Sequence, residues 1–342
     1  MKAPYPYFGG KSKVASVVWD RLGDPPNYIE PFFGSGAVLL ARPQSHQWAD
    51  RIETVNDLDG LIVNFWRALQ ADPASVAHWA DWPVSECDLH ARHAWLVGQK
   101  RSLQGHLEGD PDYYDAKIAG WWVWGISSWI GGGWCSGDGP WEQVEGLLII
   151  KGDTGKIKRE LPHLSNAGMG INRKRPHLGD AGMGINLQPH LGDAGAHCEA
   201  WSQHLEHVMR QLSDRFRRVR ICCGDWSRIC GPTPTEKLGI TGVFLDPPYS
   251  PHLRDDGLYS TESDVTVAVR AWAITHGDNP NYRIALCGYE EEHEMPIGWT
   301  EYHWTASAGY GSMGTGRGRD NRAKEMIWFS PFCVPRNQLR LF

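Results

Sequence analysis

The sequence predicts an α/β protein built on a mostly parallel, doubly wound sheet. Strand-like runs alternate with helical patterns, and several of the runs end in an acidic or polar residue. The runs cover residues 27–30, 52–56, 218–224, 242–246, 282–288 and 324–330. Strands that alternate with helices favour parallel pairing. Such sheets bind ligands at the carboxyl ends of their strands, at a switch in strand order. We therefore expect the chemistry at the polar strand ends.

The composition fits a folded core with a sizeable insertion. The chain has 342 residues, of which 41% are hydrophobic and 22% are charged. Its 8 cysteines form no CxxC pair, which disfavours a zinc module or a disulfide framework and favours a reducing cytoplasm. No apolar run is long enough to cross a bilayer, so no membrane partner is expected. The net charge of −6 requires that any nucleic-acid binding come from local basic patches.

The first strand leads into a glycine turn. In YIEPFFGSGAVLL (28–40) the strand is followed by glycines and by a short helix predicted from about Gly36 to Arg42. Glycine lets the backbone approach a ligand closely, and a helix start offers free N–H groups. The segment is neither a Walker A loop nor a GxGxxG fingerprint. It predicts a ligand loop, and the alternative is a plain strand-to-helix turn.

The second strand ends in TVNDLD (54–59). An acidic side chain at this point commonly binds the ribose hydroxyls of an adenosine-containing ligand. We favour Asp57 for the ribose, although Asp57 or Asp59 could instead cap the next helix. Spaced apolar residues predict that helix, and they are Leu61, Ile62, Phe65, Trp66 and Leu69.

The middle of the chain, 71–215, breaks the alternating pattern. It contains a helical stretch near 86–104 and a tryptophan-rich stretch at 120–141. The tryptophan rings either form a small core of the insertion or include one that inserts between stacked bases of a nucleic acid. Three short, glycine-rich near-repeats follow at 162–197, too short for a solenoid. They are a tolerated surface loop or a nucleic-acid contact. An apolar stripe from Trp201 to Phe216 predicts a helix before the third strand.

The fourth strand ends in GVFLDPPYSP (242–251). The carboxylate of Asp246 and the carbonyl of Pro247, whose φ is fixed, are two acceptors suited to an amine with two hydrogens. Pro248 continues the rigid turn, and Tyr249 offers a flat face for a base. Acceptors that hold both hydrogens of an exocyclic amine favour a pyramidal nitrogen and free its lone pair. The alternative is a strand end followed by a proline turn.

Taken in order, the motifs YFGGK, EPFFGSG, NDLD, CCGDW, LDPPY and NRAKEMIWFS resemble the Dam-like family of DNA adenine-N6 methyltransferases, especially its phage and prophage members. The resemblance spans about 1–70 and 216–342 and implies a Rossmann-like sheet with S-adenosylmethionine as methyl donor. It implies a discontinuous catalytic domain, 1–70 and 216–342, and a mainly helical and loop insertion at 71–215 for target recognition. It also implies action on double-stranded DNA by base flipping, in a restriction–modification setting or outside one. A monomer is the default expectation.

The resemblance also implies roles for residues at matching motif positions. Asp246, Pro247, Pro248 and Tyr249 would form the catalytic site. The methyl donor would be bound by Tyr7, Gly9, Gly10, Lys11, Glu30, Pro31, Phe32, Gly34, Gly36 and Asp57. Asp225 and Trp226 would lie along the donor's adenine or near the target pocket. No metal ligand is expected, because no cysteine or carboxylate pattern accompanies the recurring histidines His163, His177 and His190.

Basic residues that punctuate the insertion and the loop 316–322 are the candidates for DNA contact. They are Lys156, Lys158, Arg159, Arg173, Lys174, Arg175, Arg317 and Arg319. A second group of arginines either contacts DNA or solvates a helix end, and its members are Arg210, Arg215, Arg217, Arg218 and Arg220. Three other functions stay open: a cytosine-N4 methyltransferase, a methyltransferase of structured RNA, and a DNA-binding protein that has lost catalysis. Asp rather than Ser at position 246 favours adenine over cytosine.

Overall fold

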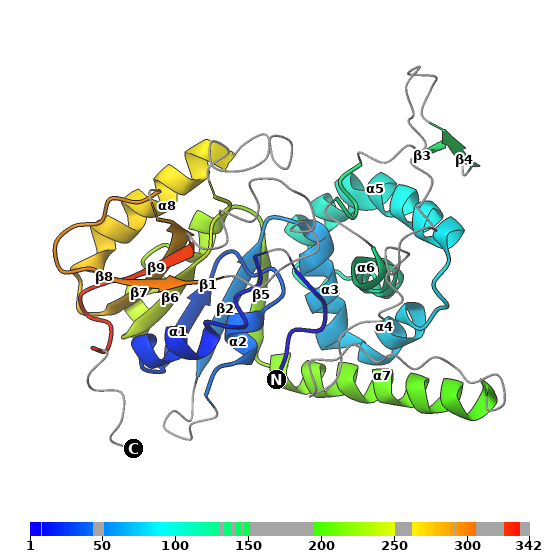
Figure 1. The fold of residues 1–342 in the computed structure, drawn as a ribbon, viewed down its shortest axis with the longest axis horizontal. Coiled ribbons are helices and arrows are strands. Elements are labelled where there is room, and N and C mark those ends of the chain that lie inside the picture. Colours follow the sequence, from blue (N-terminus) through cyan, green and yellow to red (C-terminus); the bar gives the residue numbers. More distant parts are fainter. Residues whose placement is uncertain are drawn as a thin grey trace. The chain divides into compact units, whose positions relative to one another are not determined.

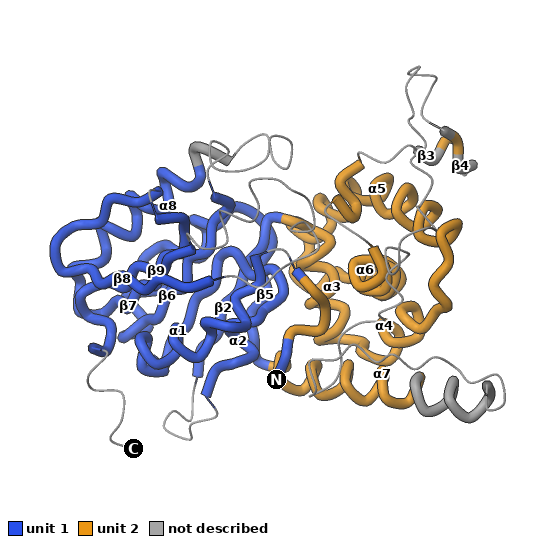
Figure 2. The backbone as a smooth tube through the Cα atoms, viewed as in Figure 1, with its two compact units in different colours: residues 1–2, 7–58, 218–342 blue, residues 3–6, 59–217 orange. Residues whose placement is uncertain are grey.

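The computed structural model divides the chain into two compact units, shown in two colours in Figure 2. Unit 1 comprises 1–2, 7–58 and 218–342, and unit 2 comprises 3–6 and 59–217. The residues described are 1–7, 9–43, 51–129, 133–137, 141–144, 147–150, 194–249, 262–290, 292–305 and 325–335. The expected functional division into 1–70 with 216–342 and 71–215 stays a prediction.

Unit 1 is built on a seven-stranded sheet with the order β5-β2-β1-β6-β7-β9-β8 (Figure 1). The strands are β1 (Asn27–Glu30), β2 (Ile52–Asp57), β5 (Val219–Cys223), β6 (Thr241–Leu245), β7 (Tyr282–Tyr289), β8 (Thr300–Trp304) and β9 (Glu325–Phe329). The first five of these pair in parallel, and β9 runs antiparallel to β7 and β8. The sheet confirms the predicted α/β class, and all six predicted strands form.

Helices lie against both faces of this sheet because side chains of a strand alternate between its faces. On β6, Val243 and Leu245 belong to one buried cluster with Val269 and Ala273 of helix α8 (Glu262–Gly277). On the other face, a Cβ at Gly242 would lie 2.7 Å from Pro25 and 3.5 Å from Leu22 of helix α1 (Ala15–Leu22). Burial on both faces explains why β6 reads as an unbroken apolar run.

The strand order reverses between β1 and β6, which are neighbours in the sheet. From β1 the chain proceeds outward to β2, and from β6 it proceeds to β7 in the other direction. The glycine turn follows β1 and leads into the short helix α2 (Ala37–Leu40), close to the bounds predicted for it. The segments after β1, β2 and β6 therefore meet at one edge, where doubly wound sheets bind ligands.

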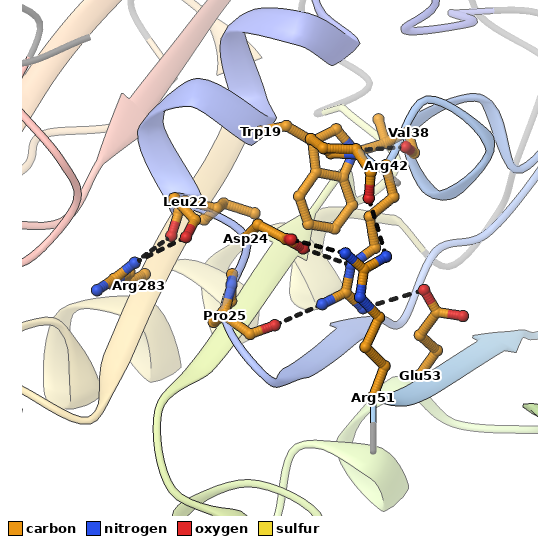
Figure 3. A network of polar contacts seen from close by, with 11 residues as sticks. Trp19, Leu22, Asp24, Pro25, Val38, Arg42, Arg51, Glu53 and Arg283 are labelled. Atoms are coloured by element: carbon orange, nitrogen blue, oxygen red, sulfur yellow. Dashed lines mark hydrogen bonds and ion pairs between the residues drawn. The ribbon is translucent and has the colours of Figure 1, made fainter. Parts of the chain in front are cut away.

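The opposite edge of the sheet is held by a network of charges around Arg42 (Figure 3). Its guanidinium contacts Asp24 Oδ1 at 2.8 Å and Glu53 Oε1 at 3.0 Å, and it donates to the carbonyl of Pro25. Arg51 contacts the other oxygen of Asp24 at 2.8 Å. Asp24 and Pro25 precede β1 and Glu53 lies near the start of β2, so the network joins the amino ends of two neighbouring strands.

Unit 2 is mainly helical. Its helices are α3 (Gly60–Ala71), α4 (Pro73–Ala80), α5 (Glu86–Gly109), α6 (Ala116–Ser128) and α7 (Ala194–Phe216). Tyr5, from the short segment 3–6, is 2% exposed and lies edge-on to the rings of Phe65 and Trp122. The predicted apolar face of α3 is buried, and so are Trp122 and Trp124 of the tryptophan-rich stretch. These two rings therefore pack in the core of unit 2.

The predicted strands did not include β3, β4 and β8. The antiparallel pair β3 (Trp141–Val144) and β4 (Leu147–Ile150) lies within the insertion that we expected to be mainly helical and loop. Strand β8 is one of the two edge strands of the main sheet, and of its residues only Trp304 is buried. Among the described residues, no helix is both long enough and apolar enough to span a membrane. The near-repeats, apart from their last residues, lie outside the described residues.

Candidate active site

The carboxyl end of β6 carries a partly buried ion pair. Asp246 is the first residue after the strand, and its Oδ1 lies 3.0 Å from Nζ of Lys11. The ammonium group also donates to the carbonyl of Gly9 at 2.9 Å and lies 3.7 Å from Glu325 Oε2. The lysine of the N-terminal glycine turn and the aspartate of LDPPY, 235 positions apart in the chain, thus meet in unit 1.

Lys11 is 4% exposed but stays charged. Burial alone would lower the pKa of its ammonium group, because it penalises the charged form. The negative charges of Asp246 and Glu325 act in the opposite direction, and the net result is a pKa well above the ordinary value. The group is therefore a permanent cation shared between two carboxylates.

Tyr249 joins the same cluster through its hydroxyl. The phenolic oxygen lies 2.9 Å from Glu325 Oε2 and 3.2 Å from Asp246 Oδ1. Its ring lies edge-on to Tyr289, with centroids 4.6 Å apart, and Lys11 Nζ lies 5.2 Å from the ring centroid. Burial and the two carboxylates raise the pKa of Tyr249, so the hydroxyl keeps its proton and donates. The side chain is only 4% exposed, so a base could reach its face only after a rearrangement.

The two prolines hold this strand end in place. Pro247 is buried, and the carbonyl of Pro248 accepts a hydrogen bond from Thr266 Oγ1 of α8 at 2.6 Å. Because proline fixes φ, this contact leaves the backbone between β6 and Tyr249 little freedom. Asp246 is thereby kept at the sheet edge.

The loop after β1 requires glycine at its centre. Gly34 has φ +49, and a Cβ there would lie 2.7 Å from Cε1 of Tyr7. Its backbone N–H donates to Asp57 Oδ2 at 2.8 Å. Gly36 has φ +67 at the start of α2, and Gly10 donates to the Tyr7 carbonyl at 3.2 Å. The predicted donor residues Tyr7 and Asp57 therefore both contact Gly34.

The carboxylate of Asp57 faces the loop of Gly34, whereas Asp59 caps a helix. Oδ1 of Asp59 accepts from the N–H of Leu61 at 2.9 Å and caps α3. Of the two acidic residues proposed as caps, Asp59 therefore fills that role. Asp57 ends β2 and is half-buried at the sheet edge.

The side chains of Asn56 and Glu30 stabilise the loop that follows β1. The amide of Asn56 donates to the carbonyls of Pro31 (3.1 Å) and Gly224 (2.9 Å), which tie the segments after β1 and β5 to β2. Glu30 is 2% exposed and accepts from the hydroxyl of Tyr28 at 2.8 Å. Burial raises the pKa of Glu30 well above its usual range and favours its neutral form.

Phe32 and Trp226 form an aromatic pair at the same edge. Their rings are nearly parallel, with an interplanar angle of 28° and centroids 6.3 Å apart. Asp225 precedes the tryptophan and accepts from the N–H of Ser227 at 2.9 Å, which begins a short 3₁₀ helix at 226–229. The segment CCGDW thus contributes the ring of Trp226, while Asp225 caps the 3₁₀ helix.

The residues at this edge of the sheet suit S-adenosylmethionine as a ligand. This molecule has an adenine ring, ribose hydroxyls, a positively charged sulfur and an amino-acid end. The edge offers an aromatic pair, a carboxylate at the end of β2, two acidic side chains around Lys11 and a glycine loop whose space a Cβ would fill. Within the described ranges, no group of three or more His, Cys, Asp or Glu side chains could hold a metal ion.

Comparison with known families decides the class of enzyme. Residues 7–84 match the family model of D12 class N6 adenine-specific DNA methyltransferases. This segment is therefore similar to the D12 class of DNA methyltransferases. The methyltransferase is an enzyme that methylates the N6 amine of adenine in DNA, and its sheet is of the Rossmann-like methyltransferase type. No curated protein matches the chain. The matched residues include YFGGK, EPFFGSG and NDLD and end before LDPPY.

The residues expected to contact DNA fall into two groups. Lys156, Lys158, Arg159, Arg173, Lys174, Arg175, Arg317 and Arg319 lie outside the described part of the methyltransferase. Arg210 of α7 pairs with Glu206 at 2.5 Å, and Arg217, which directly follows α7, pairs with Asp214 at 2.7 Å. These two contacts favour the helix-solvating role for that pair of arginines.

Sequence reasoning assigned no role to Glu325, although this residue lies in the motif NRAKEMIWFS. Glu325 begins β9, is 5% exposed, and contacts both Lys11 and Tyr249. An acidic residue at the start of a strand that is otherwise apolar was the available signal. Asn56 was also missed, because a buried amide that bridges two loops leaves no recognisable spacing in the sequence.

Proposed function

We propose that the methyltransferase binds S-adenosylmethionine along the carboxyl ends of β1, β2 and β6 and presents it to an adenine turned out of duplex DNA. The observation that carries the proposal is the meeting of Lys11, Asp246 and Tyr249 beside the loop of Gly34 and Asp57. When bound, S-adenosylmethionine supplies a methyl carbon that leaves its sulfur without the bonding electron pair, so the receiving nitrogen must provide a lone pair.

The adenine amine is a poor nucleophile because its lone pair is delocalised into the ring. Asp246 and the carbonyl of Pro247 accept hydrogen bonds from the two N6 hydrogens and favour a pyramidal nitrogen. Preorganised acceptors of this kind commonly contribute a large share of catalysis. Asp246 need not be a strong base, since N6 becomes acidic once it carries the methyl group and can release its extra proton to solvent.

The remaining residues bind and orient. Tyr7, Gly9, Gly10, Lys11, Gly34 and Gly36 line the amino-acid end of the donor, and Asp57 accepts from the ribose. Phe32 and Trp226 flank the donor's adenine. Glu30 acts by fixing the loop, since its side chain is buried against Tyr28. Stacking of the target base on Tyr249 requires the base to be flipped out, which costs a few kcal/mol.

Replacement of Asp246 by alanine tests the proposal. We expect methyl transfer to unmethylated duplex DNA to fall by about 100-fold or more, as for loss of one preorganised hydrogen-bonding group. Transfer is measured with labelled S-adenosylmethionine in a filter assay, and donor binding is measured by calorimetry and should persist. Asp278→Ala, at an exposed site after α8, is the matched control and should transfer at the wild-type rate. Undiminished transfer by Asp246→Ala would refute the catalytic role.

A further inference from the structure

We propose that a pocket within unit 2 binds a guanine base. The pocket has a volume of about 630 Å³ and is lined by residues of α4, α5, α6 and α7 and of the segment between α4 and α5. A cavity of this size is typical of sites for small ligands. All of its lining residues belong to unit 2 (Figure 2), whereas the candidate active site lies in unit 1. This binding is therefore separate from the function proposed above.

Four indole rings line the pocket. Trp79 on α4 and Trp95 on α5 each lie edge-on to Trp121 on α6, with ring centroids 6.3 Å and 5.0 Å apart. Trp82, which follows α4, is 50% exposed. Every nucleobase has a π face that stacks on an aromatic side chain. The rings therefore favour a planar, aromatic ligand.

Two cations of unit 2 already lie over these rings. Nζ of Lys117 lies 4.5 Å from the ring centroid of Trp121 and 4.8 Å from that of Trp95. The guanidinium carbon of Arg92 lies 4.8 Å from the centroid of Trp121 and 5.3 Å from that of Trp82. An aromatic cage for a cationic ligand offers its ring faces to the incoming charge. Here the two side chains take that place, so a neutral ligand is favoured.

Arg92 supplies an unused hydrogen-bond donor to the pocket that it lines. The residue is 7% exposed, and its Nη1 is buried without a hydrogen-bond partner among the described residues. A buried donor that lacks an acceptor lowers the stability of the fold. The guanidinium presents its N–H groups as a planar fork, which fits two acceptors side by side. A ligand with two adjacent acceptors would therefore satisfy this group.

Carboxylates supply acceptors in the same pocket. Asp88 lies four residues before Arg92 on α5, so the two side chains share one face of the helix. The hydrogen bonds that the Asp88 carboxylate accepts within the described part of the chain, from Ser85 at 2.6 Å and Trp82 at 3.4 Å, both go to Oδ2. Its Oδ1 is left for a ligand. Two further acids line the pocket, Asp81 and Glu206. Acidic side chains disfavour a phosphate group and favour a ligand with N–H donors.

Guanine matches this arrangement of donors and acceptors. Its N7 and O6 are adjacent acceptors that fit the fork of an arginine. Its N1–H and N2–H₂ groups are adjacent donors that fit a carboxylate. Adenine and thymine have no edge with two adjacent acceptors, and cytosine has one such edge but only a single donor group. Arg92 and Asp88 would therefore select guanine, while the indole rings hold its plane.

The test is the affinity of the full chain for short single-stranded DNA, measured by fluorescence anisotropy. A labelled oligothymidine that carries one guanine should bind about tenfold more tightly than plain oligothymidine, as for one bidentate contact between arginine and guanine. Arg92→Lys keeps the positive charge but loses the planar fork, so this preference should disappear. Replacing the guanine by 7-deazaguanine removes the N7 acceptor without altering the protein, and most of the preference should again be lost.

Arg101→Lys is the matched control, because Arg101 is an exposed arginine on the same helix, α5. Its preference for the guanine oligonucleotide should equal that of wild type. A preference that persists both in Arg92→Lys and with 7-deazaguanine would overturn the inference. Asp246→Ala should keep the preference, because Asp246 lies in unit 1. Guanine binding and the proposed methyl transfer can therefore fail independently.

A guanine in DNA and a free guanine nucleotide present the same edges, so guanosine triphosphate is titrated separately by calorimetry. Binding of the triphosphate that Arg92→Lys abolishes, without a preference for the guanine oligonucleotide, would support the inference and assign the pocket to a free nucleotide. A preference for the guanine oligonucleotide without binding of the triphosphate would assign the pocket to DNA. Absence of both would overturn the inference.

Discussion

Gly34 shows how one backbone position fixes the shape of the loop after β1. Its φ of +49 lies in the left-handed region, and the ring of Tyr7 occupies the space where a Cβ would be. An L side chain in this region costs about 1–2 kcal/mol, before any clash is counted. The residue thus combines two separate reasons for glycine.

Gly34→Ala should therefore destabilise unit 1 by at least about 1–2 kcal/mol and weaken donor binding, because Tyr7 must move. Chemical denaturation measures the first effect and calorimetric titration with S-adenosylmethionine the second. Gly98→Ala is the control, since Gly98 lies on α5 where an added Cβ would meet open space. It should raise stability by up to about 1 kcal/mol, as for glycine to alanine in a helix. Unchanged stability in Gly34→Ala would contradict the account.

The residues of the site differ in how readily they can be predicted from the sequence. Lys11, Gly34, Asp57 and Asp246 lie in motifs at strand ends or turns, where polar residues and glycine stand out from an apolar run. The structure brings all four to one edge of the sheet. Glu325 could not be assigned in this way, because its relevance depends on the antiparallel direction of β9, which no local pattern reveals.

At the level of elements, the charge network around Arg42 joins the amino ends of β1 and β2. The guanidinium contacts Asp24 and Glu53, which are 8% and 6% exposed. Removing one partner of a buried ion pair strands the other charge and is strongly destabilising. The network therefore stabilises the two strands whose opposite ends carry the donor loop and Asp57.

Arg42→Met should lower the free energy of unfolding by about 3–5 kcal/mol, because it leaves Glu53 buried without this partner. Urea unfolding followed by tryptophan fluorescence measures the change. Arg220→Met, at an exposed position on β5, serves as the control and should change stability by less than about 0.5 kcal/mol. A loss in Arg42→Met no larger than in the control would show that Arg51 alone satisfies the acids.

The elements were predictable to different degrees for a physical reason. The strands that lie inside the sheet are buried along nearly all of their length, and all of them were identified. Strand β8 is at the edge, and its burial pattern contains one buried residue among exposed and half-buried ones. Such a strand forms because β9 offers it hydrogen-bonding partners, and that information is not local. The pair β3 and β4 was also not predicted, although its two strands are neighbours in the sequence.

At the level of the whole molecule, a chain with a net charge of −6 must concentrate positive charge to bind DNA. We expect Lys156, Lys158, Arg159, Arg173, Lys174 and Arg175 to contribute. Replacing all six by glutamine should weaken DNA binding and reduce the slope of log affinity against log salt by up to about 5, since each phosphate contact contributes about 0.9. Fluorescence anisotropy at several salt concentrations measures the slope.

Replacing Arg210 and Arg217 by glutamine is the corresponding control, because each already pairs with an acid on α7. This double variant should keep the wild-type slope. A six-residue variant with an unchanged slope would place the DNA contacts elsewhere in the chain. Donor binding should be unaffected in both variants, which separates loss of DNA contact from loss of folding.

The packing of Tyr5 into unit 2 determines which residues must be included if unit 2 is transferred to another enzyme. Its ring is enclosed by Phe65 and Trp122, although it precedes them by about sixty positions or more and the chain enters unit 1 only two residues later. A graft cut at residues 59 and 217 would therefore leave a hole the size of one aromatic ring. Exchange of unit 2 between relatives would have to include the first six residues, or fill that hole with a new side chain.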